Sequence, residues 1–457
     1  MKILFISLGC DKNLVDSEHM LGKLSSRGHV VVDDETEAEA IVVNTCAFIH
    51  DAKEESVSNI LEMAEYRKDG KCRCLIVTGC LAERYRQEIL DEIPEVDAVI
   101  GTNSYDEILT AIESCDQGER SLIMKPLTGL PDNEKKRLMT TGGHYEYLKI
   151  AEGCEKHCTY CIIPKLRGKF RSVPMEELLE EATEMASQGV RELILVAQET
   201  TIYGKDIYGE KSLHILLKKL CEIPGIRWIR VLYCYPEEIY PELIQVMRDE
   251  PKICHYLDLP IQHCNDTVLK RMGRRTTKQE LIDIITELRR QIPDIVLRTS
   301  LITGFPGETE EQHEEMMEFV DEIEFDRLGV FTYSPEEGTP AAEFPDQIDE
   351  ETKLDWQDEI LSLQQEVSYD NGTKRIGQEL DVVVEGYVPN ENAYVCRTYA
   401  DTPGVDGYFF LNTDETLNSG DFVKARVTGA EEYDLIGDLV EAYDMLEEEV
   451  AAYEKSK

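Results

Sequence analysis

The sequence predicts an α/β protein of several domains, with an N-terminal open parallel sheet, a central partial (β/α)6 barrel and a small C-terminal all-β barrel. Three observations predict this class. The chain has 457 residues, which is enough for about two to four domains. Short apolar runs alternate with helical patterns over most of its length. Beyond residue 371 the runs become short and alternating and are separated by Asn, Gly and Pro, which is typical of a β-barrel.

The N-terminal domain is expected over residues 1–116. Its candidate strands are the apolar runs 3–7, 40–44, 74–78 and 97–101. Between them, apolar residues recur at helical spacing, for example over 53–67 and 81–92. Strands that alternate with helices favour a parallel sheet. The following segment, 117–144, is rich in turn residues and charges and is expected to be an exposed linker.

The central domain is expected over residues 145–370. Its six candidate strands lie at 147–151, 192–197, 226–233, 256–261, 295–304 and 327–333. Helix-like sequence separates each strand from the next, and a further helix is expected over 350–369. Six such units in series favour an incomplete β/α barrel, whose site lies at the carboxyl ends of the strands.

The C-terminal domain is expected over residues 371–440. Its candidate strands are 379–388, 393–400, 407–412 and 421–430. They alternate and are punctuated by turn residues, as in a small β-barrel. The acidic tail 441–457 is expected to end as a frayed helix.

Composition narrows the function classes. The chain has 92 acidic and 48 basic residues and a formal charge of −44, which repels nucleic acid at long range and suits a basic partner. The alternative is a general solubility adaptation. No apolar stretch approaches the roughly 18 residues of a membrane-spanning helix, and the start lacks a signal-peptide cleavage site. We therefore expect no membrane partner and a cytoplasmic location, where thiols stay reduced.

The central trio of cysteines, Cys154, Cys158 and Cys161, forms a CxxxCxxC motif directly after a predicted strand. Thiolates are soft ligands that suit iron–sulfur clusters, and this spacing lets one loop wrap a cluster face. Three ligands leave one iron of a four-iron cluster open, whereas an electron-carrying ferredoxin fills that corner with a fourth Cys. The alternatives are a zinc site completed by His157 or another residue, and three unconnected thiols.

The N-terminal trio, Cys10, Cys46 and Cys80, follows three predicted parallel strands. Carboxyl ends of parallel strands share one sheet edge, so these cysteines are expected to converge there. The alternative is ordinary burial, because Cys is a common core residue. The remaining eight are interpreted as packed or incidental thiols: Cys72, Cys74, Cys115, Cys221, Cys234, Cys254, Cys264 and Cys396.

These motifs resemble a known family. The segment GCEKHCTYC is similar to the signature of radical S-adenosylmethionine (SAM) enzymes, and six βα units match that family's partial barrel. The N-terminal motifs GCDKNLVDSE, NTCAF and TGCLAERY, with a C-terminal barrel like a TRAM domain, narrow the resemblance to the methylthiotransferases. The resemblance covers nearly the whole chain.

Two branches of this family differ in substrate, which is either tRNA adenosine or an aspartate of ribosomal protein twelve of the small subunit. Several segments resemble the ribosomal-protein branch. They are GCDKNLVDSE in place of a GCQMN-like start, VAQETTIYG, LYCYP, LPIQHCNDTVLKRMGRRTT, and GVDGYFF with EEYDLIGDL. The tRNA enzymes usually carry an LPxQSGS-like run where this chain has LPIQH at 259–263. Residues 370–440 hold 14 acidic and five basic residues, whereas an RNA-gripping module should be basic. The alternative is that this barrel merely follows the acidic whole.

The resemblance implies two [4Fe–4S] clusters, one on each trio, and SAM bound to the open iron of the central cluster. It implies that a deoxyadenosyl radical removes hydrogen from the aspartate β-carbon. It also implies that the N-terminal cluster region supplies the sulfur and that a further SAM supplies the methyl group. The implied partners are a reductant protein and the basic ribosomal protein, either free or on the ribosome, with tRNA less favoured. Two residues depart from the family pattern: Glu199 stands where Asp is common, and Cys264 where a small residue without a thiol is expected.

Further residues are candidates for cofactor binding. Tyr160 is placed beside adenine or in the core, and Gln198 and Glu199 face the cofactor or form a surface turn. Arg298 and Ser300 precede Gly304 and Gly307, two glycines that permit close approach of adenosine or serve a tight turn. A basic stretch follows the cluster loop and either neutralises the clusters or a carboxylate, or is a solvated face; it comprises Lys165, Arg167, Lys169 and Arg171.

Two competing functions remain open. The nearer one is a tRNA adenosine methylthiotransferase. Loss of a methylthio group from tRNA in a deletion strain would distinguish it from an enzyme that modifies the ribosomal protein. The other, from a different class, is an iron–sulfur electron carrier or binding scaffold, which would form no deoxyadenosine from SAM.

Overall fold

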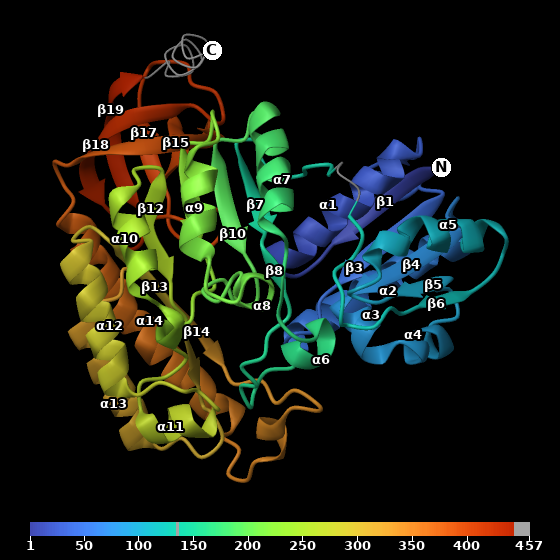
Figure 1. Ribbon diagram of the computed structural model, residues 1–457, viewed down its shortest axis with the longest axis horizontal. Helices are drawn as coiled ribbons and strands as arrows, with labels where there is room; N and C mark the ends of the chain where they lie inside the picture. The colour runs from blue at the N-terminus through green and yellow to red at the C-terminus, as the bar shows by residue number, and fades with distance from the viewer. Residues whose placement is uncertain (134–136, 443–457) are drawn as a thin grey trace.

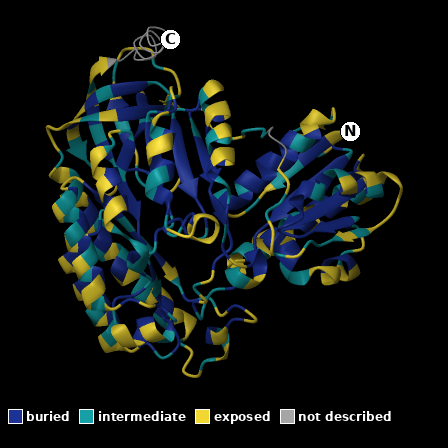
Figure 2. Cartoon of the chain, in the orientation of Figure 1, coloured by how far each residue is buried: buried dark blue, intermediate teal, exposed yellow. Residues whose placement is uncertain are grey.

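The computed structural model describes residues 1–133 and 137–442 and has three parts (Figure 1). An N-terminal α/β domain lies beside a larger sheet of parallel strands and outer helices, and a small β-barrel lies against one end of that sheet. The strands are largely buried, while the outer helices show exposed faces to solvent (Figure 2). No helix in the two described ranges is long and apolar enough to cross a membrane.

The N-terminal sheet has six strands in the order β2-β1-β3-β4-β5-β6, and every neighbouring pair is parallel. The strands are β1 (Lys2–Ser7), β2 (Val30–Val31), β3 (Ala40–Thr45), β4 (Cys74–Gly79), β5 (Ala98–Ile100) and β6 (Ser121–Ile123). The helices are α1 (Asp11–Ser26), α2 (His50–Asp69), α3 (Cys80–Tyr85), α4 (Gln87–Glu92) and α5 (Ile108–Asp116), with a 3-10 turn at Tyr105–Glu107. Separate apolar clusters cover its two faces. The open parallel sheet predicted from the sequence is confirmed.

Three details differ from the sequence prediction. The edge strands β2 and β6 were not expected, because runs of two or three residues carry no usable periodicity. The strand β6 lies within the segment expected to be only a linker, 117–144, so the sheet extends beyond residue 116. The helix expected over 81–92 is divided into α3 and α4 at Arg86, whose φ of 45° is left-handed.

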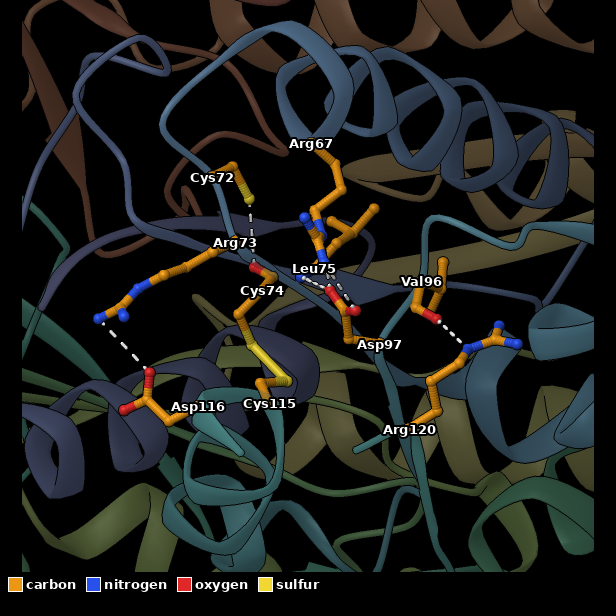
Figure 3. Close-up of a disulfide and its surroundings, with 10 residues drawn as sticks. All are labelled: Arg67, Cys72, Arg73, Cys74, Leu75, Val96, Asp97, Cys115, Asp116 and Arg120. Carbon is orange, nitrogen blue, oxygen red and sulfur yellow. Dashed lines mark hydrogen bonds and ion pairs between the residues drawn. A yellow bond between two sulfur atoms is a disulfide. The ribbon is translucent and has the colours of Figure 1, made fainter. Parts of the chain in front are cut away.

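Two cysteines interpreted as packed or incidental thiols are bonded to each other. Cys74 at the start of β4 and Cys115 in α5 form a disulfide with a Cα–Cα separation of 5.6 Å (Figure 3). Asp97 lies beside them and is held by Arg67, with Nε 3.0 Å from Oδ2. The pair is 41 residues apart and has no diagnostic spacing, so only the packing of α5 on β4 could reveal it. The interpretation of these two residues as unpaired thiols was wrong.

The central sheet also has six parallel strands, and its order β14-β13-β12-β11-β10-β7 follows the chain. The strands are β7 (Tyr145–Lys149), β10 (Glu192–Val196), β11 (Trp228–Val231), β12 (Ile253–Asp258), β13 (Val296–Thr303) and β14 (Arg327–Thr332). A short hairpin pairs β8 (Ala151–Glu152) with β9 (Arg171–Ser172). Strands that follow one another in the chain are neighbours in the sheet, which is the order of a partial β/α barrel. The six strand–helix units of the sequence predicted this order.

Helices cover the outer face of this sheet (Figure 1). They are α7 (Met175–Ser187), α9 (Leu213–Cys221), α10 (Pro241–Asp249), α12 (Lys278–Gln291), α13 (Glu310–Ile323) and α14 (Glu350–Thr373). Shorter helices are α6 (Ile163–Arg167), α8 (Lys205–Tyr208) and α11 (Asp266–Arg271), with 3-10 turns at Pro236–Glu238 and Pro340–Glu343. The helix α14 confirms the one expected over 350–369. The inner face has its own apolar cluster, which includes Ile194, Tyr256 and Val296.

The C-terminal domain is a closed barrel in the order β15-β16-β17-β19-β18. Its strands are β15 (Glu379–Val388), β16 (Ala393–Thr398), β17 (Phe409–Asn412), β18 (Phe422–Ala430) and β19 (Leu435–Ala442). The small β-barrel is confirmed, with one more strand than the four expected. The strand β19 includes residues 441 and 442, which were expected to belong to the acidic tail. The rest of the segment where a frayed helix was expected, 443–457, lies outside the described residues.

Buried ion pairs fix the C-terminal barrel to the inner face of the central sheet. Glu192 at the start of β10 accepts from Arg230 of β11 and from Arg397 of β16, each at 2.8 Å, and all three side chains are buried. The loop after β16 adds Asp401 and Asp406, which pair with Arg327 and Arg298 of the sheet. The C-terminal barrel therefore closes the amino-terminal side of the sheet's inner face and leaves the carboxyl ends of the strands to the site.

Candidate active site

The central trio lies on an irregular loop between β8 and α6. Gly153, just before Cys154, has φ of 79°, and a Cβ there would lie 2.2 Å from the Lys169 carbonyl oxygen. The chain can therefore turn sharply against the returning segment only because this residue is glycine. Cys158 and Cys161 close a turn through the Cys161 amide, which donates to the Cys158 carbonyl at 3.1 Å. Cys154 and Cys158 are buried, and Cys161 is partly exposed.

The loop is held by the rest of the partial barrel. The Cys154 amide donates to the Gly168 carbonyl at 3.1 Å, and the Gly153 amide donates to Gln198 Oε1 at 2.7 Å. On the other side, Thr159 donates through its amide and hydroxyl to the backbone carbonyls of residues 272 and 271. Gln198 thus holds the loop of the central trio just after the end of β10, and its contact with the cofactor stays a prediction.

A cavity of about 610 Å³ opens beside this loop. Its lining includes Cys158, Cys161 and His157 on one side and the segment 338–340 on the other. Burial raises the pKa of the Cys154 thiol to about 11 and raises that of Cys161 further. Such thiols stay protonated until a metal binds, which couples metal binding to proton release.

A smaller cavity of about 290 Å³ is lined by Lys156 of the same loop and by Glu199 and Phe170, among others. Glu199 is buried, its Oε1 accepts from the Thr201 hydroxyl at 3.1 Å, and its Oε2 lies 3.4 Å from Lys156 Nζ without a hydrogen-bond partner in the described chain. Burial raises the pKa of Glu199 to about 7, and Lys156 opposes the rise. The Glu199 carboxylate is near enough to Cys154 to raise the pKa of that thiol, and its Oε2, paired with Lys156, keeps lone pairs that are able to accept an ammonium group.

The other candidate cofactor residues have partners of their own. Tyr160 packs against the apolar cluster of Val268, Met272, Phe305 and Tyr333, which is the core alternative. Arg298, which was expected near the cofactor, pairs with Asp258 at 2.8 Å and with Asp406 of the C-terminal barrel at 3.4 Å, on the amino-terminal half of β13.

The glycines after β13 serve packing. A Cβ on Gly304 would lie 2.2 Å from Lys353 Cγ of α14, and one on Gly307 would lie 2.0 Å from Arg271. Lys353, in the first turn of α14, therefore lies directly against Gly304 at the end of β13. Ser300 lies in the middle of β13, opposite Gly329 of β14, and is partly exposed.

The N-terminal trio lies at one edge of the first sheet. Ser7 of β1 pairs with Asn44 of β3, and Asn44 pairs with Thr78 of β4, so these residues form one row. Cys10, Cys46 and Cys80 come two or three residues after that row on three adjacent strands. The structure therefore brings together the three cysteines that the strand-end argument grouped. Burial raises the pKa of Cys80 to about 12, which Arg167 opposes and the Cys46 and Cys10 thiols reinforce.

Two more glycines permit this convergence. Gly9 before Cys10 has φ of 86°, and a Cβ there would lie 2.7 Å from Cys46 Cβ. Gly79 before Cys80 has φ of 90°, and a Cβ there would lie 2.3 Å from Asn44 Oδ1 and 2.5 Å from the Thr45 carbonyl oxygen. The sequence carried a signal for these residues that the prediction did not use, namely a Gly-Cys dipeptide that occurs at three strand ends.

The two trios approach each other across the domain boundary. Helix α6 starts two residues after Cys161 and lies beside α3 (Figure 1), and Ile162 and Leu166 belong to the apolar core of the N-terminal domain. At its end, Arg167 reaches Cys80 Sγ with a guanidinium nitrogen at 3.7 Å. On the N-terminal side, Lys12 lies over the ring of Tyr233 from the central domain, 3.2 Å from its centroid.

The basic stretch after the cluster loop has mixed roles. Arg167 is buried against carboxylates, Lys165 donates to the Gly338 carbonyl, and Arg171 donates to backbone carbonyls including that of Leu127. Lys169 is exposed. Sequence reasoning missed the partners of Arg167, which are Asn13, Asp16 and Glu152, because they come from two domains and lack a motif.

The donor sets fit polynuclear clusters better than a single ion. A tetrahedral zinc with Zn–S bonds of about 2.3 Å holds its sulfur ligands within about 4.6 Å of one another. Within residues 1–133 and 137–442, only Cys74, Asp97 and Cys115 form a group of three or more His, Cys, Asp or Glu side chains whose ligand atoms all lie within 4.8 Å of one another. Two of these three residues share a disulfide. Both trios are therefore wider than a single-ion site, as the ligands of a four-iron cluster must be.

Comparison with known proteins supports this architecture. The chain matches the family described as "Uncharacterized protein family UPF0004" over residues 2–101, the radical SAM superfamily over 148–320 and the TRAM domain over 376–440. A ribosomal protein uS12 methylthiotransferase RimO from Lachnoclostridium phytofermentans is 59% identical over 437 residues, covering 96% of this chain and 99% of the relative. The chain belongs to this methylthiotransferase family. A relative of the same name from Clostridium botulinum is 50% identical, covering 96% of this chain and 98% of its own length.

Solved structures agree on the fold at low identity. The radical SAM methyltransferase TsrM from Kitasatospora setae, with cobalamin and a [4Fe–4S] cluster bound, has a TM-score of 0.55 at 12% identity and covers 74% of this chain and 73% of its own. The cobalamin-dependent radical enzyme OxsB has a TM-score of 0.51 at 14% identity and covers 80% of this chain and 56% of its own. These likenesses concern the arrangement of the sheets.

Proposed function

We propose that this protein is a radical SAM methylthiotransferase that attaches a methylthio group to the β-carbon of an aspartate in ribosomal protein uS12. The observation that carries the proposal is the junction of the two cysteine trios, where the helix that follows Cys161 ends against Cys80. A generic radical SAM enzyme needs only the central trio. A second trio, whose Cys80 contacts the last residue of the helix that follows Cys161, supports an enzyme that also inserts sulfur.

We assign one [4Fe–4S] cluster to Cys154, Cys158 and Cys161 and the other to Cys10, Cys46 and Cys80. When bound, the clusters and SAM supply one-electron chemistry, sulfur and a methyl group. The chain holds the ligands rigidly, because left-handed glycines fix the three strand-end turns and Gln198 anchors the central loop.

We assign Glu199 to the ammonium group of SAM. Its side chain lines the 290 Å³ cavity. The Thr201 hydroxyl holds Oε1, while Oε2 lies 3.4 Å from Lys156 Nζ and accepts no hydrogen bond within the described chain. Tyr160 supports the loop from the apolar cluster behind it, and Ser300 remains available on the inner face of the sheet. Arg298 and Gly304 are left out of the cofactor site, because each is engaged in domain packing.

Charge supports a basic protein substrate. The net charge of −44, with 14 acidic and five basic residues over 370–440, attracts a basic ribosomal protein and repels RNA at long range. The relatives at 59% and 50% identity carry uS12 in their names. We further propose a cytoplasmic location and a reductant protein as electron source.

A deletion strain tests the substrate. We expect uS12 from that strain to lack a methylthio mass that a plasmid copy of this gene restores, while tRNA keeps its modifications in both. Mass spectrometry of uS12 peptides and of tRNA nucleosides measures the two outcomes together. Loss of a methylthio group from tRNA, with uS12 unchanged, would contradict the proposal.

Cysteine variants test the division of work between the trios. After anaerobic reconstitution, Cys154→Ala should form no deoxyadenosine from SAM, because the open-iron cluster loses a ligand. Cys10→Ala should still form deoxyadenosine but leave uS12 unmodified. Cys221→Ala, which removes a partly exposed thiol of α9 outside both trios, is the control and should do both. Equal loss of cleavage in Cys10→Ala would argue against separate roles.

A further inference from the structure

One arginine connects the two trios. Arg167 is the last residue of α6, and its side chain is only 2% exposed. It belongs to the central domain by sequence, yet its guanidinium enters the edge of the N-terminal sheet. One of its terminal nitrogens lies 3.7 Å from Cys80 Sγ, within hydrogen-bonding distance of a thiolate.

The guanidinium is fixed from several sides. The nitrogen near Cys80 also donates to Asn13 Oδ1 at 2.5 Å. The other donates to Asp16 Oδ2 at 2.7 Å and to Glu152 Oε1 at 3.2 Å. Asp16 and Asn13 come from α1 of the N-terminal domain, and Glu152 from β8 of the central domain. A planar fork held by oxygens of both domains has little freedom to move away from the sulfur.

The charges around Arg167 are balanced. Lys149 forms ion pairs with the same two carboxylates, so Asp16 and Glu152 are shared by two cations. Glu152 Oε2 has no hydrogen-bond partner in the described chain. Because both carboxylates lie on the far side of the guanidinium, the group that faces Cys80 is a cation with N–H donors.

We propose that Arg167 is a positioning residue that sets the reduction potential of the N-terminal cluster and fixes that cluster relative to the central trio. The proposal rests on the assignment of a cluster to Cys10, Cys46 and Cys80. An N–H donor and a positive charge at a ligand sulfur stabilise the form of a cluster that has gained one electron, since that electron adds negative charge. Because α6 also follows Cys161, the same contact holds the two trios at one separation.

The test uses the full chain with Cys154, Cys158 and Cys161 replaced by Ala, so that only the N-terminal cluster is reconstituted. In this parent we compare Arg167→Gln, Arg167→Lys and the control Lys169→Gln. Lys169 is two residues away, its side chain is 84% exposed, and its removal deletes the same charge at the surface. Iron and sulfide content measures loading, and a dithionite titration followed by electron paramagnetic resonance measures the midpoint potential.

We expect Arg167→Gln to lower the equilibrium constant for one-electron reduction at least tenfold, a shift of about 59 mV to lower potential. Arg167→Lys keeps the charge but cannot reach Cys80 and both domains at once, so its midpoint should lie between the parent and Arg167→Gln. Lys169→Gln should match the parent. If Arg167→Gln fails to bind a cluster, the midpoint of Arg167→Lys decides.

Two results would overturn the proposal, and they are distinguishable. A loaded Arg167 variant with the midpoint of the parent would refute the role of Arg167 while the cluster assignment stands. A parent that binds no iron would refute the assignment of a cluster to the N-terminal trio, and the role of Arg167 with it.

Discussion

Buried charged residues hold the domains together at the scale of single side chains. Arg137 lies between Glu18 of α1 and Glu146 of β7, and none of the three side chains is more than 5% exposed. Burial raises the pKa of Glu146 to about 7; Arg137 opposes the rise and the Glu18 carboxylate adds to it. A carboxyl group whose pKa is raised by folding binds protons more tightly in the folded state.

This shift predicts a pH dependence of stability. Between the ordinary Glu pKa of 4.5 and about 7, the folded state binds more protons, so the free energy of unfolding should fall as pH rises, by up to about 1.4 kcal/mol per pH unit. Glu146→Gln should flatten this decline between about pH 5 and 7. Urea unfolding at several pH values measures it, with the exposed Glu62→Gln as control. Parallel declines in wild type and Glu146→Gln would disprove the assignment.

Strand-to-loop corners position the proposed metal ligands at the scale of elements. Gly9, Gly79 and Gly153 each precede a ligand cysteine and have left-handed φ values of 86°, 90° and 79°. Left-handed backbone costs other residues about 1–2 kcal/mol, and at these corners a side chain would also meet atoms of a neighbouring segment. Because these three turns leave no room for a side chain, the glycines fix where the backbone of each following cysteine lies.

Gly79→Ala should destabilise the protein and reduce iron bound at the N-terminal trio. A Cβ there meets backbone of β3 at 2.5 Å, which must shift, so we expect a loss of roughly 3 kcal/mol or more. The matched control is Gly118→Ala, which has φ of 73° but no atom within 4 Å and should cost only the conformational strain. Thermal unfolding and iron analysis provide the measurements. Equal effects of the two variants would show that φ alone matters.

Attachment of the C-terminal barrel decides the arrangement of the whole molecule. Glu192, Arg230 and Arg397 form a buried triad between β10, β11 and β16, and the Asp401 and Asp406 pairs extend it. A barrel that uses its basic residue Arg397 for docking has less positive charge to offer RNA, which agrees with a protein substrate.

Glu192→Gln should loosen this attachment. Arg230 and Arg397 would lose their shared carboxylate while buried, and breaking such a pair costs about 3–5 kcal/mol. Glu379→Gln, which breaks an exposed pair with Arg426 within the barrel, should cost less than about 1 kcal/mol. Urea unfolding compares the two, and trypsin cleavage near residue 375 reports detachment. Wild-type stability in Glu192→Gln would mean that the triad does not secure the barrel.

The sequence by itself determined the three sheets and the grouping of both trios, because strand periodicity and the position of cysteines after strands are local properties of the chain. Cys10, Cys46 and Cys80 were predictable as a group since parallel strands share one carboxyl edge. The tertiary structure decided what depends on contacts between distant segments. Arg298 joins the C-terminal barrel, Gly304 contacts α14, Cys74 pairs with Cys115, and Arg167 reaches Cys80. Such side chains are directed by the packing of whole domains, and no local spacing records which residue of another domain will face them.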